Sequence, residues 1–458
     1  MTPVREFLYF LILLTVFSVL LLLLRAEEGM PVSALVIQEP LPVAVHEIPE
    51  PEDDTLAASE PDSMLAGAPL VQEAEAGLFH PVPLVFAEDD SLRLQGLAYQ
   101  LKHASHANLP VRVVYFGDSQ IENDRITSAL RQQLQEQFAG SGPGFVPLDL
   151  YYNTRHKLII ETSKNWEIKT FQDKDFINES LLFKNALLTA VNAKGWFRIR
   201  RIRRLNPGPD YQLMKLYYTA KDSCLVTVMQ GRDVIYSGFL IPQNELATLD
   251  FQFNRTPDDI RFDFAAKDSL NIAGLSLETG SGVLVDNIAL RGLSYPTFEA
   301  SDQAAIAQML GQVKVGLFVL HFGVNLVPVQ ADDYPNFRKY FQRQIDFLKR
   351  IQPEVPILII GVSDMARMHD GQFISYPNIP VIKQIQYEIA MYNHAAFWDL
   401  QAFMGGEGAM SRWVNASPAL GRKDYVHFSD EGAEVVGQEL ARILLEVLQP
   451  ITDTLAHD

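Results

Sequence analysis

Continuous hydrophobic runs alternate with helical patterns in two stretches of this chain. Residues 111–116, 315–320 and 355–360 are almost entirely apolar, and each run ends at a glycine or a histidine. Runs of this kind indicate strands buried on both faces of a parallel sheet. Apolar residues recur three or four positions apart elsewhere, which predicts helices at 123–138, 337–351, 381–394 and 429–448, with a short strand at 396–400. We therefore predict an α/β domain whose parallel sheet carries helices on both faces.

The stretch between about residues 150 and 286 has a different pattern. Short runs such as 251–253 and 261–264 alternate apolar and polar residues, and Asn, Asp, Gly and Pro separate them. A period of two is typical of antiparallel strands that bury one face. Since α/β patterns lie on both sides, we predict an antiparallel β-sandwich at 151–285, inserted between two parts of the α/β domain at 81–150 and 286–458.

The amino-terminal part predicts a membrane anchor followed by a linker. Residues 7–24 form an eighteen-residue apolar run broken only by Thr15 and Ser18, so a helix here is long enough for a bilayer core. We expect residues 1–25 to anchor the chain in a bilayer, with the body outside the cytoplasm. The alternative is a cleaved signal peptide, with 32–34 as a small-residue cleavage site and a secreted body.

Charge and composition narrow the function further. Residues 26–80 hold twelve Asp or Glu, seven Pro and no Lys or Arg, which predicts a disordered acidic linker. The formal charge of -18 and the pI of about 5.0 argue against a nucleic-acid partner. The single cysteine, Cys224, excludes an intrachain disulfide and a zinc cluster built on cysteines. We find no ligand spacing for a metal and no phosphate or dinucleotide loop, so we expect neither metal nor cofactor.

Three polar segments follow predicted strands or precede the last helix, where open α/β sheets place their sites. Ser119 follows the strand at 111–116, Asn325 follows the strand at 315–320, and Asp424 and His427 lie in one loop before the last helix. A serine hydroxyl needs a base to take its proton, and a histidine oriented by a carboxylate supplies one. An aspartate three positions before the histidine can reach its imidazole within a turn.

The order of these segments resembles the SGNH, or GDSL-type, hydrolase family. The matching segments are Phe116-Gly117-Asp118-Ser119-Gln120, Phe322-Gly323-Val324-Asn325 and Asp424-Tyr425-Val426-His427-Phe428. The resemblance implies a flavodoxin-like three-layer fold, with Ser119 as nucleophile, His427 as base and Asp424 as its orienting carboxylate. It also implies an oxyanion hole formed by the Ser119 N–H, the Asn325 side chain and a glycine N–H. Gly292 fits that glycine best, and Gly280 and Gly282 are its competitors.

The inserted sandwich narrows the resemblance to bacterial peptidoglycan O-acetylesterases, whose insertion is similar to a carbohydrate-binding module. We expect an inner-membrane-anchored serine esterase in the periplasm or outside the cell. It would remove O-acetyl groups from a cell-envelope polysaccharide, with peptidoglycan the leading substrate. Two alternatives remain open: an O-acetyltransferase with the same nucleophile, and a catalytically idle glycan-binding scaffold. The sequence leaves the oligomeric state undetermined.

Overall fold

The computed structural model describes residues 77–87, 94–148, 158–170, 184–188, 193–201, 210–298 and 302–454. The predicted anchor at 1–25 and nearly all of the predicted linker at 26–80 lie outside these residues. Within the described ranges, no helix combines the length and the apolar character needed to cross a bilayer.

Five parallel strands form the central sheet of the α/β part. In spatial order they are β13 (Val283–Ala289), β1 (Val111–Gly117), β14 (Lys314–His321), β15 (Ile357–Ile360) and β18 (Ala396–Trp398). All neighbouring pairs are parallel, and nearly every strand residue is buried. Numbered along the chain, the spatial order is 2-1-3-4-5, which is the flavodoxin-like order. The predicted parallel sheet is confirmed.

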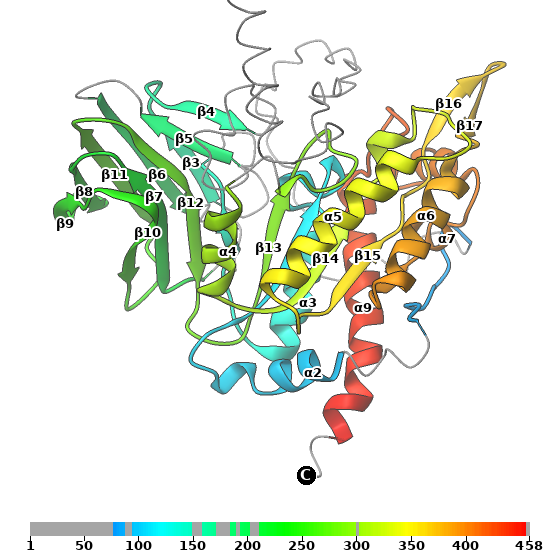
Figure 1. Cartoon of the computed structure of the whole chain (residues 1–458), viewed down its shortest axis with the longest axis horizontal. Coiled ribbons are helices and arrows are strands. Elements are labelled where there is room, and N and C mark those ends of the chain that lie inside the picture. The colour runs from blue at the N-terminus through cyan, green and yellow to red at the C-terminus, as the bar shows by residue number, and fades with distance from the viewer. Residues whose placement is uncertain are drawn as a thin grey trace, which may run out of the picture. The chain divides into compact units, whose positions relative to one another are not determined.

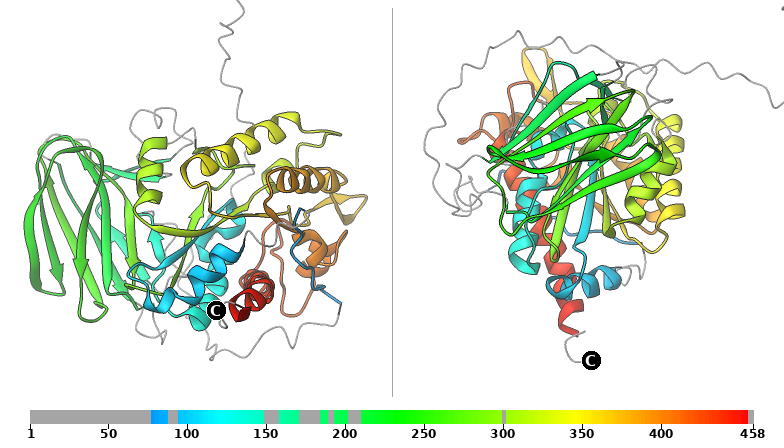
Figure 2. Two further views of the ribbon diagram at one scale, coloured as in Figure 1. Left: turned by 60° about the horizontal axis from the view of Figure 1, so that its bottom comes forward. Right: turned by 90° about the vertical axis from the view of Figure 1, so that its left-hand side faces the viewer.

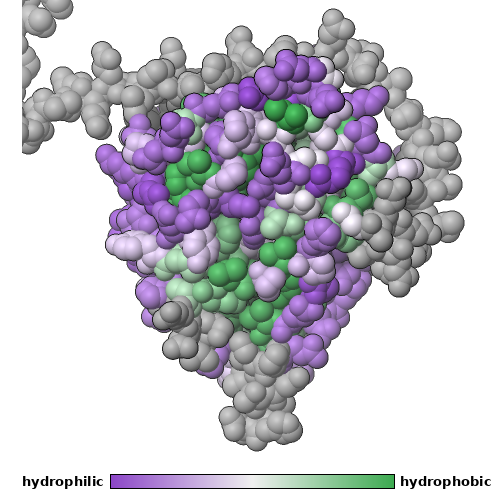
Figure 3. All heavy atoms as spheres, turned by 90° about the vertical axis from the view of Figure 1, so that its right-hand side faces the viewer, coloured by the Kyte–Doolittle hydropathy of each residue, from purple (hydrophilic) through white to green (hydrophobic). Residues whose placement is uncertain are grey.

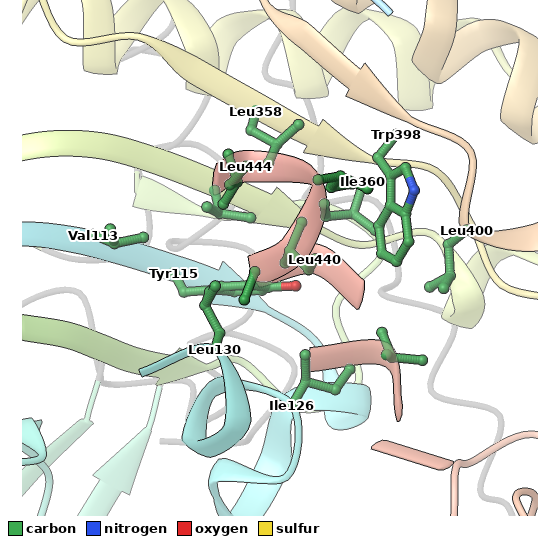
Figure 4. Close-up of a cluster of buried hydrophobic side chains, with 14 of the residues drawn as sticks. Val113, Tyr115, Ile126, Leu130, Leu358, Ile360, Trp398, Leu400, Leu440 and Leu444 are labelled. Carbon is green, nitrogen blue, oxygen red and sulfur yellow. The ribbon is translucent and has the colours of Figure 1, made fainter. Parts of the chain in front are cut away.

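Helices cover both faces of this sheet (Figures 1 and 2). One face carries α2 (Gln95–Lys102), α3 (Thr127–Phe138) and α9 (Asp430–Thr454), and the other carries α4 (Gln303–Gly311), α5 (Pro335–Ile351) and α6 (Ile379–Tyr392). Side chains alternate along β1, so Val113 and Tyr115 enter the first core while Val114 and Phe116 enter the second. Figure 4 shows part of the first core, to which β1, α3, β15, β18 and α9 all contribute. The predicted three layers are therefore present.

Helix α5 shows how a helix meets both the core and the solvent. Helix α5 buries Phe337, Phe341 and Ile345 on one side, while Arg338 and Lys339 lie outside this buried set. On the face that lies at the right of Figure 1, hydrophilic side chains predominate and apolar side chains gather in smaller patches (Figure 3). The hydrophobic effect thus stabilises the cores without leaving one continuous apolar face on this side.

The predicted helix at 123–138 differs from the structure at its beginning. A 3₁₀ segment, η5 (Ser119–Asp124), follows β1, and α3 begins only at Thr127. Asn123 and Asp124 adopt positive φ angles of 58° and 60°, which a continuing right-handed helix cannot include. The spacing of apolar residues could not reveal this break, because it reports side-chain burial and not backbone angles. Asn and Asp adopt the left-handed conformation more easily than most residues, and here they do so.

Two antiparallel sheets form the inserted sandwich, as predicted. The first holds β10 (Gln243–Gln252), β7 (Leu213–Ala220), β12 (Leu270–Glu278), β5 (Lys184–Leu188) and β4 (Glu167–Thr170), and the short β2 (Gly144–Val146) also pairs with β12. The second holds β3 (Leu158–Thr162), β6 (Ala193–Arg201), β11 (Asp259–Ala266), β8 (Cys224–Gln230) and β9 (Asp233–Leu240). Their facing side chains, such as Phe197, Phe262 and Leu216, form a third core that includes the buried Cys224.

The strand pairing shifts both ends of the insertion relative to the predicted 151–285. Strand β2 already pairs with β12 of the sandwich, so the antiparallel sheet begins before residue 151. Strand β13 pairs with β1 in the parallel sheet, so the α/β part resumes at Val283 rather than at residue 286. The sequence does not mark these ends, because β2 has only three residues and β13 is buried on both faces. Neither strand shows the alternation of apolar and polar residues that identifies an antiparallel strand.

A buried ion cluster joins the sandwich to the parallel sheet. Arg112 on β1 donates to both carboxylate oxygens of Asp286 on β13 at 2.7 and 2.9 Å, and its other nitrogen lies 2.6 Å from Glu278 on β12. Asp286 also accepts the Phe145 N–H of β2 at 2.8 Å. Burial alone would lower the pKa of Arg112, but attraction to Asp286 and Glu278 raises it. The guanidinium therefore stays charged and links strands of both sheets.

We expect Arg112→Met to lower the free energy of unfolding by about 3–5 kcal/mol, because it leaves two buried carboxylates without their cation. Arg442→Ala is the control, since Arg442 bonds Glu439 and Glu446 on the surface of α9 with 42% of its side chain exposed. That change should cost no more than about 1 kcal/mol. Urea unfolding of both variants measures the difference, and equal losses would contradict a bridging role for Arg112.

Candidate active site

Ser119 lies immediately beyond the carboxyl end of the central strand. Asp118 caps the following η5 segment, and its carboxylate accepts the Gln120 N–H at 3.0 Å. This cap turns the chain sharply at the strand end and sets Ser119 as the first residue of the 3₁₀ segment. Among the described residues, the Ser119 N–H has no hydrogen-bond acceptor. The hydroxyl and a free backbone donor therefore belong to the same residue.

The structure brings His427 and Asp424 to Ser119. His427 Nε2 lies 2.8 Å from Ser119 Oγ, and His427 Nδ1 lies 2.8 Å from Asp424 Oδ2. With Nδ1–H donated to the carboxylate, Nε2 is left as an acceptor for the serine hydroxyl. The hydroxyl, imidazole and carboxylate thus form one hydrogen-bonded chain across residues 308 positions apart. This arrangement can deprotonate the hydroxyl as it attacks an electrophile.

A tight turn places Asp424 below the imidazole. Its second oxygen, Oδ1, accepts the Val426 N–H at 2.9 Å and the His427 N–H at 3.0 Å. Tyr425 between them has a φ of 59°, which the turn requires. Partial burial would raise the pKa of Asp424, but the hydrogen bonds from the side chain and backbone of His427 lower it to about 2. The carboxylate therefore stays ionised at neutral pH and holds Nδ1–H toward itself.

The two loops that flank Ser119 follow the two neighbours of β1. In the sheet, Gly117 pairs with Ala289 of β13 on one side and with His321 of β14 on the other. Gly292 therefore follows one neighbouring strand and Asn325 follows the other, both at the edge where Ser119 lies. The strand order reverses at β1, and open α/β sheets bind ligands at such a point.

The register separates the competing glycines. Gly280 and Gly282 precede β13, and Val283 pairs with Val111 at the start of β1, so both lie at the opposite edge from Ser119. Gly292 has a φ of 82°, and its N–H has no acceptor among the described residues. Asn325 Nδ2 donates to the Leu293 carbonyl at 2.9 Å, which ties the two loops together. Of the three glycines, only Gly292 occupies the Ser119 edge, and its part in an oxyanion hole stays a prediction.

The site is open at the histidine side and closed at the strand side. Ser119 is 6% exposed, whereas the side chains of His427 and Asp424 are 23% and 44% exposed. A substituent on a large polymer can therefore approach the hydroxyl from the side of the loop at 422–428. Within the described ranges, no three His, Cys, Asp or Glu side chains come close enough to hold a metal ion.

Two side chains that the sequence did not single out contact the same site. Gln120 and Arg125 are both buried, at 1% and 2% exposure, and both donate hydrogen bonds to the loop that carries His427. Gln120 belongs to the quoted motif, yet nothing in the motif shows where its amide points. The sequence does show a glutamine and an arginine, both long polar side chains, just after a predicted buried strand. It does not show what they bond, because their partners lie about 300 residues further along the chain.

His321, at the end of β14, is a buried neutral imidazole. Its Nδ1 lies 3.0 Å from the Tyr115 hydroxyl, and burial lowers its pKa to about 3. The pKa in the unfolded chain is about 6.5. Below pH 6.5 this histidine therefore binds a proton in the unfolded chain but not in the folded chain. The free energy of unfolding falls as the pH falls toward 3.

We expect His321→Gln to flatten this dependence, because glutamine keeps a hydrogen-bonding group for Tyr115 and does not titrate. Relative to the variant, the wild type should lose up to about 1.4 kcal/mol of unfolding free energy per pH unit between pH 6.5 and 4. Urea unfolding at pH 7, 5.5 and 4.5 checks this. Parallel pH curves for the two proteins would rule out His321 as the titrating group.

Comparison with known proteins supports the fold. No protein-family model matches the sequence. No curated protein matches it either. Among solved structures, a peptidoglycan O-acetylesterase matches with a TM-score of 0.64 and 19% sequence identity, over 80% of this chain and 99% of that one. A family two carbohydrate esterase from Clostridium thermocellum (TM-score 0.25, 9% identity, 63% of this chain and 98% of that one) and a family 29 carbohydrate-binding module (TM-score 0.21, 10% identity, 31% and 89%) match too weakly to support an argument. The resemblance found in the sequence is thus confirmed at the level of the fold, which this chain shares with a peptidoglycan O-acetylesterase.

Proposed function

We propose that this chain is a serine esterase that removes O-acetyl groups from a polysaccharide. The observation that carries the proposal is the continuous chain of two 2.8 Å hydrogen bonds from Ser119 Oγ through His427 to Asp424. The ionised Asp424 and the open side of the loop fit a hydrolase that acts on a large substrate. The shared fold with a peptidoglycan O-acetylesterase adds support, although fold by itself does not assign an activity.

The proposed reaction proceeds in two halves. Ser119 Oγ attacks the acetyl carbonyl while His427 Nε2 takes the hydroxyl proton, and Asp424 stabilises the imidazolium that forms. The tetrahedral oxyanion would accept hydrogen bonds from the Ser119 and Gly292 N–H groups and the Asn325 side chain. The sugar oxygen then leaves with the proton from His427, and the acetyl group remains on Ser119. Water, deprotonated by His427, attacks this ester and releases acetate and free Ser119.

We further propose a location and a substrate. An anchor at residues 7–24 would hold the body outside the cytoplasm, in the periplasm or at the cell surface, where cell-envelope polysaccharides lie. Among these, O-acetylated peptidoglycan is the substrate that we propose, because that is what the solved protein of the same fold acts on by its name. An acetyltransferase would use the same acyl-enzyme, and the fate of the acetyl group distinguishes the two.

We expect Ser119→Ala to lower acetate release from O-acetylated peptidoglycan by roughly 10³-fold or more, because the nucleophile is lost. The control is Ser105→Ala, since Ser105 is an exposed serine whose hydroxyl, among the described residues, bonds only its neighbour His106. A fluorophosphonate probe should label the wild type and the control but not Ser119→Ala. Equal acetate release from all three proteins would refute the esterase, and acetyl transfer to an added glycan in preference to water would indicate the transferase.

We also propose that the inserted sandwich holds the polysaccharide on its five-stranded sheet. A cavity of about 460 Å³ opens there, lined among others by Trp196, Lys194, Asn165, Thr227 and Asp263. An aromatic ring can cover the apolar face of a sugar, while amide, hydroxyl and carboxylate groups bind its hydroxyls. This composition favours a saccharide over a purely apolar ligand.

We expect Trp196→Ala to weaken retention on insoluble O-acetylated peptidoglycan by roughly 10-fold, since one aromatic contact contributes on the order of 1–2 kcal/mol. Hydrolysis of 4-nitrophenyl acetate should not change, because this small ester needs only the Ser119 site. Co-sedimentation and ester hydrolysis measure the two properties separately. Unchanged co-sedimentation would exclude this cavity as the binding site, and the esterase proposal would still stand.

A further inference from the structure

The side chains of Gln120 and Arg125 connect the serine turn to the histidine loop. Gln120 Nε2 donates to the Val426 carbonyl at 2.8 Å, and Gln120 Oε1 accepts the Phe428 N–H at 3.4 Å. These two partners are the residues on either side of His427. The buried amide of Gln120, the residue after Ser119, therefore bonds the backbone on both sides of His427.

Arg125 makes a second connection between the same segments. Its Nη2 donates to the Ser119 carbonyl at 2.5 Å, and its Nη1 donates to the Phe428 carbonyl at 3.2 Å. Its Nε donates to the Glu122 carbonyl at 3.0 Å, which fixes the guanidinium on its own segment. One planar group thus contacts the backbone of both the serine and the residue after the histidine. The rigid fork of arginine suits it to holding two carbonyls at a fixed separation.

These contacts matter because little else joins the two segments. Among the described residues, no backbone-to-backbone hydrogen bond connects 117–123 with 422–428. The Asp424 turn orients the imidazole within its own loop. The Tyr425 carbonyl also accepts the Ala366 N–H at 3.0 Å and the Tyr425 ring stacks on Phe373, so segments other than the serine turn support this loop as well. The outer side of the loop faces solvent, with Asp424 44% exposed. The direct links between this loop and the serine turn are made by side chains: the bond from Ser119 to His427 itself and the bonds of Gln120 and Arg125.

We propose that Gln120 and Arg125 are positioning residues that hold His427 Nε2 within hydrogen-bonding distance of Ser119 Oγ. The inference rests on the esterase function proposed above and adds to it two groups that act through His427 without touching substrate. A displacement of about 1 Å at a reacting group can cost on the order of 10²-fold in rate. Loss of either connection should therefore slow proton transfer and leave the binding of a small ester unchanged.

The first test compares two glutamine variants of the full chain. Gln120→Met removes the amide at similar length, and Gln344→Met is its matched control. Gln344 is also buried, accepts the Phe298 N–H at 2.9 Å and donates to the Tyr340 carbonyl at 3.2 Å, all away from the triad. With 4-nitrophenyl acetate, Gln120→Met should lower kcat roughly 10- to 100-fold with little change in KM. Gln344→Met should keep the wild-type kcat at a temperature where thermal melts show both variants folded.

The second test uses conservative replacements and a coupling measurement. Gln120→Asn keeps an amide with both a donor and an acceptor but shortens the side chain by one methylene group, so its kcat should lie between those of the wild type and Gln120→Met. It also serves as the readout if Gln120→Met fails to fold. Arg125→Lys should likewise lie between the wild type and Arg125→Met. The double variant Gln120→Met with Arg125→Met should lose less than the product of the single losses, because both changes release the same loop.

The outcomes separate this inference from the proposed function. If the wild type hydrolyses the ester through Ser119 but the Gln120 and Arg125 variants keep kcat within twofold, the positioning role is refuted and the esterase stands. An equal fall in kcat for Gln344→Met and Gln120→Met would also refute it, since general destabilisation would then explain both. A slower fluorophosphonate labelling of Ser119 in Gln120→Met, matching its loss in kcat, would support the proposal. A wild type without Ser119-dependent activity would refute the proposed function itself.

Discussion

Strand β1 is paired along both of its edges, and this pairing fixes the position of the site. β1 hydrogen-bonds to β13 on one side and β14 on the other, and its side chains supply both cores of the α/β part. A strand held in this way cannot shift along its axis without moving every side chain to a new position in a packed interior. The carboxyl end of β1 is therefore a fixed point. Ser119 follows that end directly, and the loops after the two neighbouring strands must flank it.

The same strand also anchors the inserted sandwich. Arg112 faces Asp286 in the parallel sheet and Glu278 in the antiparallel sheet, so one cation satisfies acids from both sheets. A buried ion pair of this kind adds little net stability compared with an apolar contact, but it strongly penalises any arrangement that separates the partners. The cluster therefore favours one placement of β12 and β2 against β1. The sandwich is tied to the strand that precedes Ser119 rather than to a surface loop.

Burial and hydrogen bonding shift the pKa values of the two aspartates near the site in opposite directions. Asp424 receives hydrogen bonds from the side chain and backbone of His427, and its pKa falls to about 2. Asp118, only a strand end away, is fully buried, and burial raises its pKa to about 7 although the Gln120 and Val324 N–H groups counteract it. His321 is buried beside Tyr115 and stays neutral, while His427 reaches solvent at the mouth of the site. The local environment, and not residue type, therefore sets the direction in which each of these pKa values moves.

Patterns along the chain were enough to predict most of the helices and strands and the contacts between residues close in sequence. Short continuous apolar runs ending at a glycine or a histidine predicted the buried strands, because a strand covered on both faces has apolar residues on both sides. The Asp424 to His427 spacing predicted a local turn. Which groups from distant segments meet depends on how the strands pair and how the helices pack. The strand register places Gly292, and not Gly280 or Gly282, at the edge where Ser119 lies. Positive φ angles at Asn123 and Asp124 make α3 begin later than the sequence pattern predicts. Gln120 and Arg125 bond residues about 300 positions away. The spacing of apolar residues shows which face of a helix or strand is buried. The partner of a polar side chain depends instead on where the backbone of a distant segment lies, and that spacing carries no information about this position.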